Sequence, residues 1–314
     1  MNGKRIAVKT ARCDSSMPFT VHRSPLTVSG FSLIELIVVM VVVGILAGIV
    51  AVFIRSPMEG YMAASRRAEL SDTADGALHR IARDVRTALP NSVRITQNEG
   101  ITYLEFLPIQ DGGRYREAQR STPTCASTPD DNDTPGCNIL DFTQSDTTFD
   151  VLGPAVTVAI GQSVVIYNLG IEGADVWAGD NLSVVEIASS TGCAGSGSAC
   201  TLVFGSFKFP FEPPGNRFYL VGAPVSYICN PANGELWRIT GYDLQATQPK
   251  QTSDFGTVDP RPVPRLLANH VTTCSFTYDP GASQRLGQLT LRIQLSQDGE
   301  TVTLYREVMV NNDA

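Results

Sequence analysis

The strongest pattern in the chain is an uninterrupted apolar run close to its N-terminus. Residues 36–54 carry no charged side chain, and Glu35 stands directly before them. The run predicts a helix over residues 31–54 of about 36 Å, which is long enough to span a bilayer. A carboxylate in such a segment costs about 2.5–3.5 kcal/mol on insertion scales, so Glu35 indicates a function beyond simple anchoring.

A second helical pattern, amphipathic in character, follows the apolar run. Arg55, Ser56 and Pro57 separate the two, and Pro57 is expected to kink or loosen the helix because proline lacks a backbone donor. Apolar residues then recur at three- and four-residue steps, which predicts a helix over residues 61–89 that ends before Pro90. The expected buried positions are Leu70, Ala74, Ala77, Leu78, Ile81, Val85 and Leu89. The Arg-rich remainder is interpreted as a solvated face, with contact to an acidic neighbouring molecule as the alternative.

Beyond Pro90 the periodicity changes to that of strands, with turn signals at residues 97–100 and 297–300 that favour antiparallel hairpins. Residues 110–150 are polar and rich in Pro and Asp, and are expected to form a loop. The fold class predicted is therefore α+β, with one long helix laid on an antiparallel sheet. The expected strands are residues 92–96, 101–107, 155–160, 163–169, 182–188, 201–204, 218–228, 235–240, 271–278, 288–296 and 301–310.

The segment GFSLIELIVVMVVVGILAGIV, residues 30–50, resembles the cleavage and methylation segment of type IV prepilins and type II secretion pseudopilins. The resemblance implies that prepilin peptidase cuts after Gly30 and methylates the new amino terminus of Phe31. It also places Glu35 at the family's acidic position, five residues after the cut. Such a carboxylate pairs with the terminal amine when the helices of several subunits bundle, because either charge buried alone is costly. The pairing sets the register between neighbouring helices. The alternatives are a signal-anchor with a stray Glu and an ordinary secretory signal.

The same resemblance implies a type IV pilin-like organisation in four parts. These are a leader peptide at residues 1–30, a membrane or filament-core helix at 31–56, an amphipathic helix at 57–90 and a β-rich periplasmic head at 91–314. Met17 is an alternative start to Met1. The implied location is the inner membrane, as a single-pass protein surrounded by lipid, and then a filament or the cell surface. The implied partners are prepilin peptidase, an inner-membrane assembly platform and other minor and major pilins.

Four later segments narrow the resemblance. They are similar to minor pilins of the mannose-sensitive haemagglutinin pilus, with pilus-assembly proteins of the PilW type and pseudopilin J as broader relatives. The segments are RRAELSDTADGALHRIARDVRTALPNSVRI, RFYLVGAPVSYIC, ELWRIT and GETVTLYREVMVNN. This implies a structural subunit that initiates or caps a filament, with inserted loops near residues 110–150 and 190–200. A secretion pseudopilin and a membrane-tethered binding or adhesive domain are the alternatives.

Charge argues against nucleic acid as a partner. The chain has 24 basic and 31 acidic residues, and removal of residues 1–30 takes away five basic residues and one acidic residue, which leaves a formal charge of −11. A surface of this sign repels phosphate, and binding of nucleic acid requires a basic face or stripe.

Cysteine use indicates an oxidising compartment. Of seven cysteines, Cys13 lies in the leader, and the other six suggest the pairs Cys125–Cys137, Cys193–Cys200 and Cys229–Cys274 among 15 possible connectivities. A zinc site is the alternative, but only His79 and His270 remain after processing and the cysteine spacings do not fit one.

Nothing in the sequence points to catalysis or to a cofactor. It contains no HExxH, P-loop or dinucleotide-binding motif, and neither mature histidine has the local context of a catalytic triad. Asp130, Asp131 and Asp133 are a weak candidate for Ca²⁺ ligands, because they lack the Gly and the terminal Glu of an EF-hand loop. A solvated acidic loop is the favoured interpretation, and the chain is expected to be a non-enzymatic protein without a metal.

Overall fold

The computed structural model describes residues 30–118, 137–154, 156–185, 200–250, 252–255, 262–281 and 286–314. In these residues one long helix, α1 (Leu33–Val85), precedes strands β1 to β14 and a short 3-10 helix, η2 (Thr252–Phe255). All strand pairings between named strands in this part of the chain are antiparallel, so the class is α+β. The chain divides into two compact units, with the boundary inside α1 between Glu59 and Gly60.

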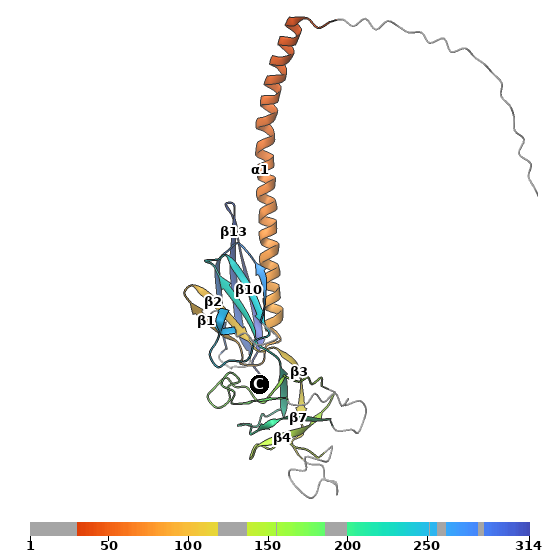
Figure 1. Cartoon of the computed structure of the whole chain (residues 1–314), viewed down its shortest axis with the longest axis vertical. Coiled ribbons are helices and arrows are strands. Elements are labelled where there is room, and N and C mark those ends of the chain that lie inside the picture. The colour runs from red at the N-terminus through yellow and green to blue at the C-terminus, as the bar shows by residue number, and fades with distance from the viewer. Residues whose placement is uncertain are drawn as a thin grey trace, which may run out of the picture. The chain divides into compact units, whose positions relative to one another are not determined.

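Helix α1 runs without a break through Pro57, so the expected interruption between residues 54 and 61 is wrong (Figure 1). Proline removes one backbone donor, and the helical hydrogen bonds of the adjoining turns are enough to carry the helix across it. The C-terminus also differs from expectation, because α1 ends at Val85 rather than at Leu89. Ala88 instead forms an antiparallel bridge with Pro108, and the Leu89 N–H donates to the Leu107 carbonyl at 2.7 Å.

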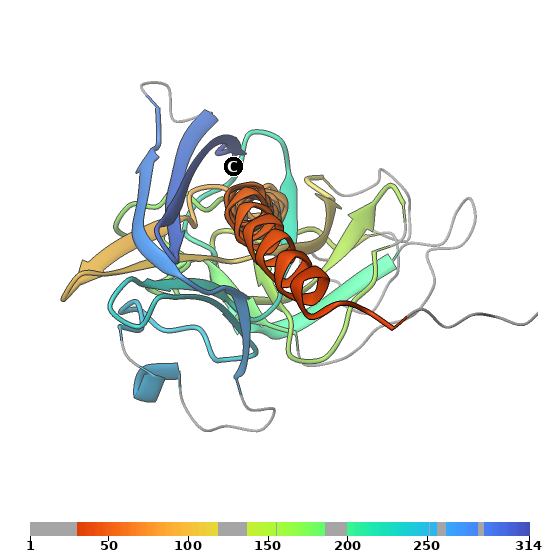
Figure 2. The ribbon, with the colours of Figure 1, turned by 90° about the horizontal axis from the view of Figure 1, so that it is seen from above.

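The C-terminal part of α1 packs on two sheets (Figure 2). One has the order β1-β2-β9-β10-β11 and the other has the order β12-β13-β14. The expected positions from Leu70 to Val85 are buried in the core shared with these sheets, so the periodicity of this half of the helix is confirmed. The strands of the two sheets are β1 (Arg94–Asn98), β2 (Ile101–Phe106), β9 (Val225–Asn230), β10 (Glu235–Thr240), β11 (Val263–Ala268), β12 (Val271–Asp279), β13 (Leu286–Gln297) and β14 (Glu300–Asn311).

A further sheet, which we call the inserted sheet, lies in sequence between the paired neighbours β2 and β9. Its order is β6-β5-β8-β3-β4-β7, and its own core contains Phe149, Phe204, Phe209 and Phe218. Figure 1 labels three of its strands, β3, β4 and β7. The strands are β3 (Ile109–Tyr115), β4 (Asp146–Leu152), β5 (Ser163–Val165), β6 (Leu182–Val184), β7 (Cys200–Phe207) and β8 (Arg217–Val221). In the described residues the head therefore has three sheets, where the sequence predicted one.

Several strand predictions are wrong for local reasons. Residues 110–150, expected as loop, include most of β3 and β4, and β11 was not expected at all. Strand β3 was missed because it contains Gly112, whose added Cβ would lie 2.9 Å from the Phe218 carbonyl oxygen, so the close pairing needs glycine there. The expected strand 218–228 is two strands, β8 and β9, which belong to different sheets. No strand forms at residues 156–160.

Candidate functional site

The helix start brings together two residues of the candidate processing segment. Helix α1 begins at Leu33, and the Leu36 N–H donates to the Ser32 carbonyl at 3.1 Å, which puts Ser32 at the N-cap. Glu35 lies in the first turn, three residues after the cap. Ser followed by Glu at this spacing is the pattern of a capping box, and a carboxylate at the N-terminal end of a helix is favoured by the helix dipole. Glu35 therefore stands at the position of a capping-box residue, in addition to its predicted role in assembly.

The apolar half of α1 has no covering surface within the chain. Every residue from 31 to 55 is exposed, and Phe31 has an exposed fraction of 79%. Among the described residues, α1 is one helix whose length and composition are sufficient to cross a membrane. Apolar surface of this extent is unfavourable in water, so it requires lipid or other apolar helices around it.

Gly44 and Gly48 lie on one side of this exposed segment, one helical turn apart. An added Cβ at either position would meet no atom within 4 Å. Small residues at this spacing allow a second helix to approach closely. The glycines are therefore free in the single chain and available for contact with another helix.

The charged half of α1 is held to the head of its own chain. Arg66 lies 3.5 Å from Asp298, Arg67 lies 2.5 Å from Glu300, and Arg306 lies 3.3 Å from Asp75. These contacts join the helix to strand β14 and to the turn between β13 and β14. The interpretation of this Arg-rich face as solvated is therefore incomplete, although such exposed pairs contribute little, about 0–1 kcal/mol each.

Asp84 forms the best-connected of these charged contacts. Its Oδ2 accepts hydrogen bonds from Arg238 Nε and from the Tyr227 hydroxyl, both at 2.8 Å, and Arg80 lies 3.1 Å from Oδ1. Burial and then the negative charge of Asp84 raise the pKa of the Tyr227 phenol. Asp84 belongs to the charged remainder of the helix that was interpreted as solvated, and for this residue the interpretation is wrong because Arg238 on β10 reaches it from the sheet. The cluster fixes the position of the helix on the five-stranded sheet.

Comparison with known families gives the decisive observation for the N-terminal segment. Residues 27–51 match the prokaryotic N-terminal methylation motif. The match contains Gly30, Phe31 and Glu35, and it supports a type IV prepilin-like protein, either pilin or pseudopilin. No curated protein and no solved structure matches the chain. The prepilin motif implies processing by prepilin peptidase and points to a structural, non-enzymatic family.

One disulfide lies wholly in the described residues. Cys229 of β9 is joined to Cys274 of β12, with the Cα atoms 6.4 Å apart, so the bond connects the five-stranded sheet to the three-stranded sheet. Cys137 is also disulfide-bonded. Cys125 and Cys193 lie outside the described residues, so Cys125–Cys137 and Cys193–Cys200 stay predictions, as does the leader peptide.

The candidate Ca²⁺ ligands Asp130, Asp131 and Asp133 also lie outside the described residues. Within the residues that the structure places, no group of three or more His, Cys, Asp or Glu side chains is arranged to hold a metal ion. His79 instead lies 2.9 Å from Asp75 and 3.1 Å from Arg306, on the exposed face of the helix.

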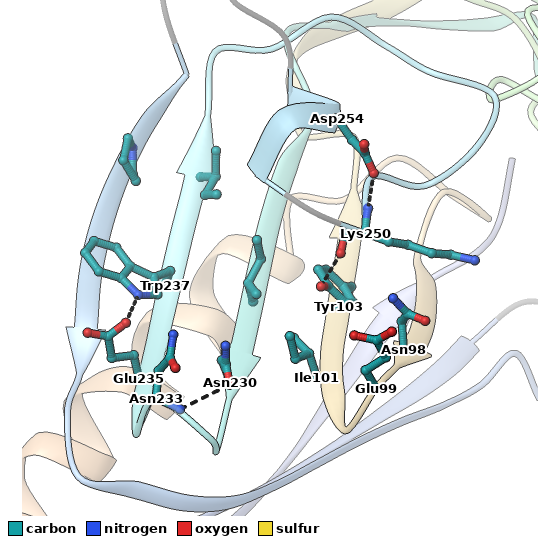
Figure 3. A pocket seen from close by; sticks show the side chains of 13 residues that line it. Asn98, Glu99, Ile101, Tyr103, Asn230, Asn233, Glu235, Trp237, Lys250 and Asp254 are labelled. Atoms are coloured by element: carbon teal, nitrogen blue, oxygen red, sulfur yellow. Dashed lines mark hydrogen bonds between the residues drawn. The ribbon is translucent and has the colours of Figure 1, made fainter.

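A pocket that the sequence did not predict lies on the five-stranded sheet (Figure 3). It has a volume of about 760 Å³, and its lining includes Tyr103, Ile228 and Trp237 together with Asn230, Asn233 and Glu235. The segment ELWRIT contained a pattern that could have indicated this pocket. Leu236 faces the core with α1, and the adjacent Trp237 must then point to the opposite face, which α1 does not cover.

Proposed function

We propose that this chain is a minor pilin that initiates or caps assembly of a type IV pilus of the mannose-sensitive haemagglutinin type. One observation carries the proposal: the methylation motif coincides with an exposed apolar helix whose charge-free run, residues 36–54, directly follows Glu35. A helix that only anchors a domain has no need of this carboxylate. A helix that must leave lipid and enter a bundle of like helices needs a polar contact to define its position.

The proposed mechanism begins with hydrolysis of the peptide bond between Gly30 and Phe31, which frees a positively charged amine two residues before α1. The peptidase then transfers a methyl group to this amine from a methyl-donor cosubstrate, and the methylated amine keeps its positive charge. This amine then pairs with the Glu35 carboxylate of a neighbouring subunit, or with that of its own chain during docking. The pairing compensates two charges that would each be costly in an apolar core, and its geometry permits one stagger between helices. Gly44 and Gly48 allow the close helix approach that this packing needs.

The assignment to a minor pilin of the mannose-sensitive haemagglutinin type rests on the four later segments quoted in the sequence analysis. They fall on the charged half of α1 and the start of β1, on β8 to β10 and on β14, which include elements that pack around the helix. The inserted sheet enlarges the head beyond this framework. A bulky head is easiest to accommodate at the end of a filament, where fewer neighbours surround it, and this supports an initiating or capping role.

The experiment that tests the proposal is quantitative mass spectrometry of sheared filaments from cells with and without the chain. We expect the chain at a small fraction of the major subunit, and we expect fewer pili when its gene is deleted. A chain found only in membranes, with pilus number unchanged by deletion, would support the tethered-domain alternative instead. Loss of protein secretion with normal pili would identify a pseudopilin.

A further inference from the structure

The pocket on the five-stranded sheet has an apolar floor on the side away from α1. Strands β2, β9 and β10 alternate, so that Leu104, Tyr227 and Leu236 face the helix core. Their neighbours Tyr103, Ile228 and Trp237 line the pocket on the other face (Figure 3). The floor therefore includes one aliphatic and two aromatic side chains on three central strands, and the lining has three further apolar residues, Ile101, Ile239 and Pro264.

The position of Trp237 is held by a defined contact. Its Nε1 donates a hydrogen bond to Glu235 Oε2 at 2.9 Å, and its side chain is half-buried, so part of the indole surface remains open to solvent. The Tyr103 hydroxyl donates to the Lys250 carbonyl, and the Lys250 N–H donates to Asp254 Oδ2 at 2.9 Å. The aromatic floor is thus ordered before any ligand arrives, which lowers the entropic cost of binding.

Around this floor the polar groups are mostly amides and carboxylates. Asn98, Asn230 and Asn233 each carry both donors and an acceptor, which matches the dual character of a hydroxyl group. Glu99, Glu235 and Asp254 add three carboxylates against one ammonium, that of Lys250. The balance repels anions and accepts neutral or positively charged groups.

The sheet itself excludes an added peptide strand at this position. Strands β2, β9 and β10 have hydrogen-bonded neighbours on both sides, so their backbone groups are used within the sheet. A ligand in the pocket must therefore be recognised by side chains. A ligand with ring C–H groups that pack on the indole, and with hydroxyls that bond to amides and carboxylates, matches both the apolar floor and the polar surround of the pocket.

We propose that this pocket binds a short saccharide that is neutral or carries an amine. The volume of about 760 Å³ falls within the range of small-ligand sites, about 300–1,000 Å³. The site does not depend on the filament role, because all of its lining residues lie in the head beyond α1. A minor pilin with this site would display a saccharide-binding surface, and a protein that never assembles would retain the same affinity.

The test is binding of the full-length protein, in a detergent without a sugar headgroup, to immobilised neutral, amine-bearing and sialylated oligosaccharides. We expect retention on neutral or amine-bearing probes and weaker retention on the sialylated ones. Trp237→Ala should lower affinity by about tenfold or more, since truncation of a central aromatic contact in a binding site commonly has this effect. Tyr305→Ala is the matched control, because Tyr305 is an exposed aromatic residue on β14 outside the pocket.

Asn233→Ala provides a second variant in an exposed turn, where loss of folding is not expected, and it should also weaken binding. Circular dichroism and thermal unfolding verify that each variant is folded. Absence of binding to every neutral and amine-bearing probe would overturn the proposal. Full retention by folded Trp237→Ala and Asn233→Ala, or stronger binding to the sialylated probes, would overturn it as well. None of these outcomes bears on filament assembly, which is measured separately.

Discussion

The guanidinium carbon of Arg94 lies 3.7 Å from the ring centroid of Trp177. Arg94 belongs to β1 of the five-stranded sheet, whereas Trp177 follows β5 of the inserted sheet, so the contact joins the five-stranded sheet to the segment between β5 and β6. Trp177 also donates its indole N–H to the Ser92 carbonyl at 3.0 Å. On its other side Arg94 donates to Glu105 at 2.6 Å, which makes one guanidinium the link between a buried carboxylate and an aromatic ring.

Removal of this link should destabilise the head. Arg94→Ala leaves the fully buried Glu105 without its cation, and loss of one partner of a buried pair costs about 3–5 kcal/mol. Chemical denaturation of the full-length protein in detergent measures the change in the free energy of unfolding. Arg114→Ala, at an exposed arginine on β3, is the control and should change stability by about 0.5 kcal/mol or less. Equal effects of the two variants would show that the pair with Glu105 is unimportant.

Glu105 should also give the head an unusual dependence on pH. Burial raises the pKa of this carboxyl, although Arg94 and Tyr242 lower it in part. A carboxyl whose pKa is higher in the folded state than in the unfolded state binds a proton more tightly when folded, so its contribution to stability becomes less favourable as pH rises through the folded-state pKa. Wild type should therefore lose stability relative to Glu105→Gln as pH rises above the ordinary carboxyl pKa and through the raised folded-state pKa. A stability difference that stays constant, or that moves the other way, would contradict this assignment.

The disulfide between β9 and β12 should contribute through the unfolded state. It closes a separation of 45 residues, and cross-links of this length stabilise by roughly 2–4 kcal/mol. The double variant Cys229→Ala, Cys274→Ala should unfold at lower denaturant concentration than wild type under non-reducing conditions. When both proteins are fully reduced, which removes the bond of Cys137 from each of them as well, their stabilities should approach each other. A gap of unchanged size under these conditions would show that packing of the sulfur atoms, and not the cross-link, is responsible.

Processing provides an independent prediction. Replacement of Gly30 by Leu should block cleavage, because a bulky side chain hinders access of the peptidase to the bond before Phe31. Intact mass spectrometry should show an N-methylated Phe31 terminus in wild type and the uncut leader in the variant. Gly48→Ala is the control, since Gly48 lies far along the helix and its Cβ would meet no neighbour within 4 Å. Normal cleavage of Gly30→Leu would contradict the predicted cut site.

The sequence predicted the helical part of this molecule better than the sheets. Apolar spacing in α1 identified the residues from Leu70 to Val85 that are buried, because a helix with one covered face shows its period directly. The inserted sheet could not be recognised in the same way, since Gly112 and Gly113 in β3 have low strand propensity and are needed for close contact with Phe218. Long-range pairs such as Asp84 with Arg238 also leave no local signal. The segment around Glu35 was visible because it is a short local motif.

Two replacements of Glu35 separate its local role at the helix start from its role in assembly. Glu35→Gln keeps a side chain that can complete the capping box with Ser32 but removes the charge, whereas Glu35→Val removes both. A role confined to the helix start predicts that Glu35→Gln assembles normally. A role in pairing with the Phe31 amine predicts that both variants are cleaved and inserted but fail to assemble, since the buried amine loses its counter-ion.

The measurement that decides between these roles is the amount of each variant in sheared filaments, relative to its amount in membranes, in cells that lack the wild-type copy. We predict that Glu35→Gln and Glu35→Val are both present in membranes with a methylated Phe31 terminus and that both are depleted from filaments, with fewer pili per cell. Incorporation of both variants at the wild-type level, with a normal number of pili, would contradict the proposal that this chain is a filament subunit positioned by Glu35.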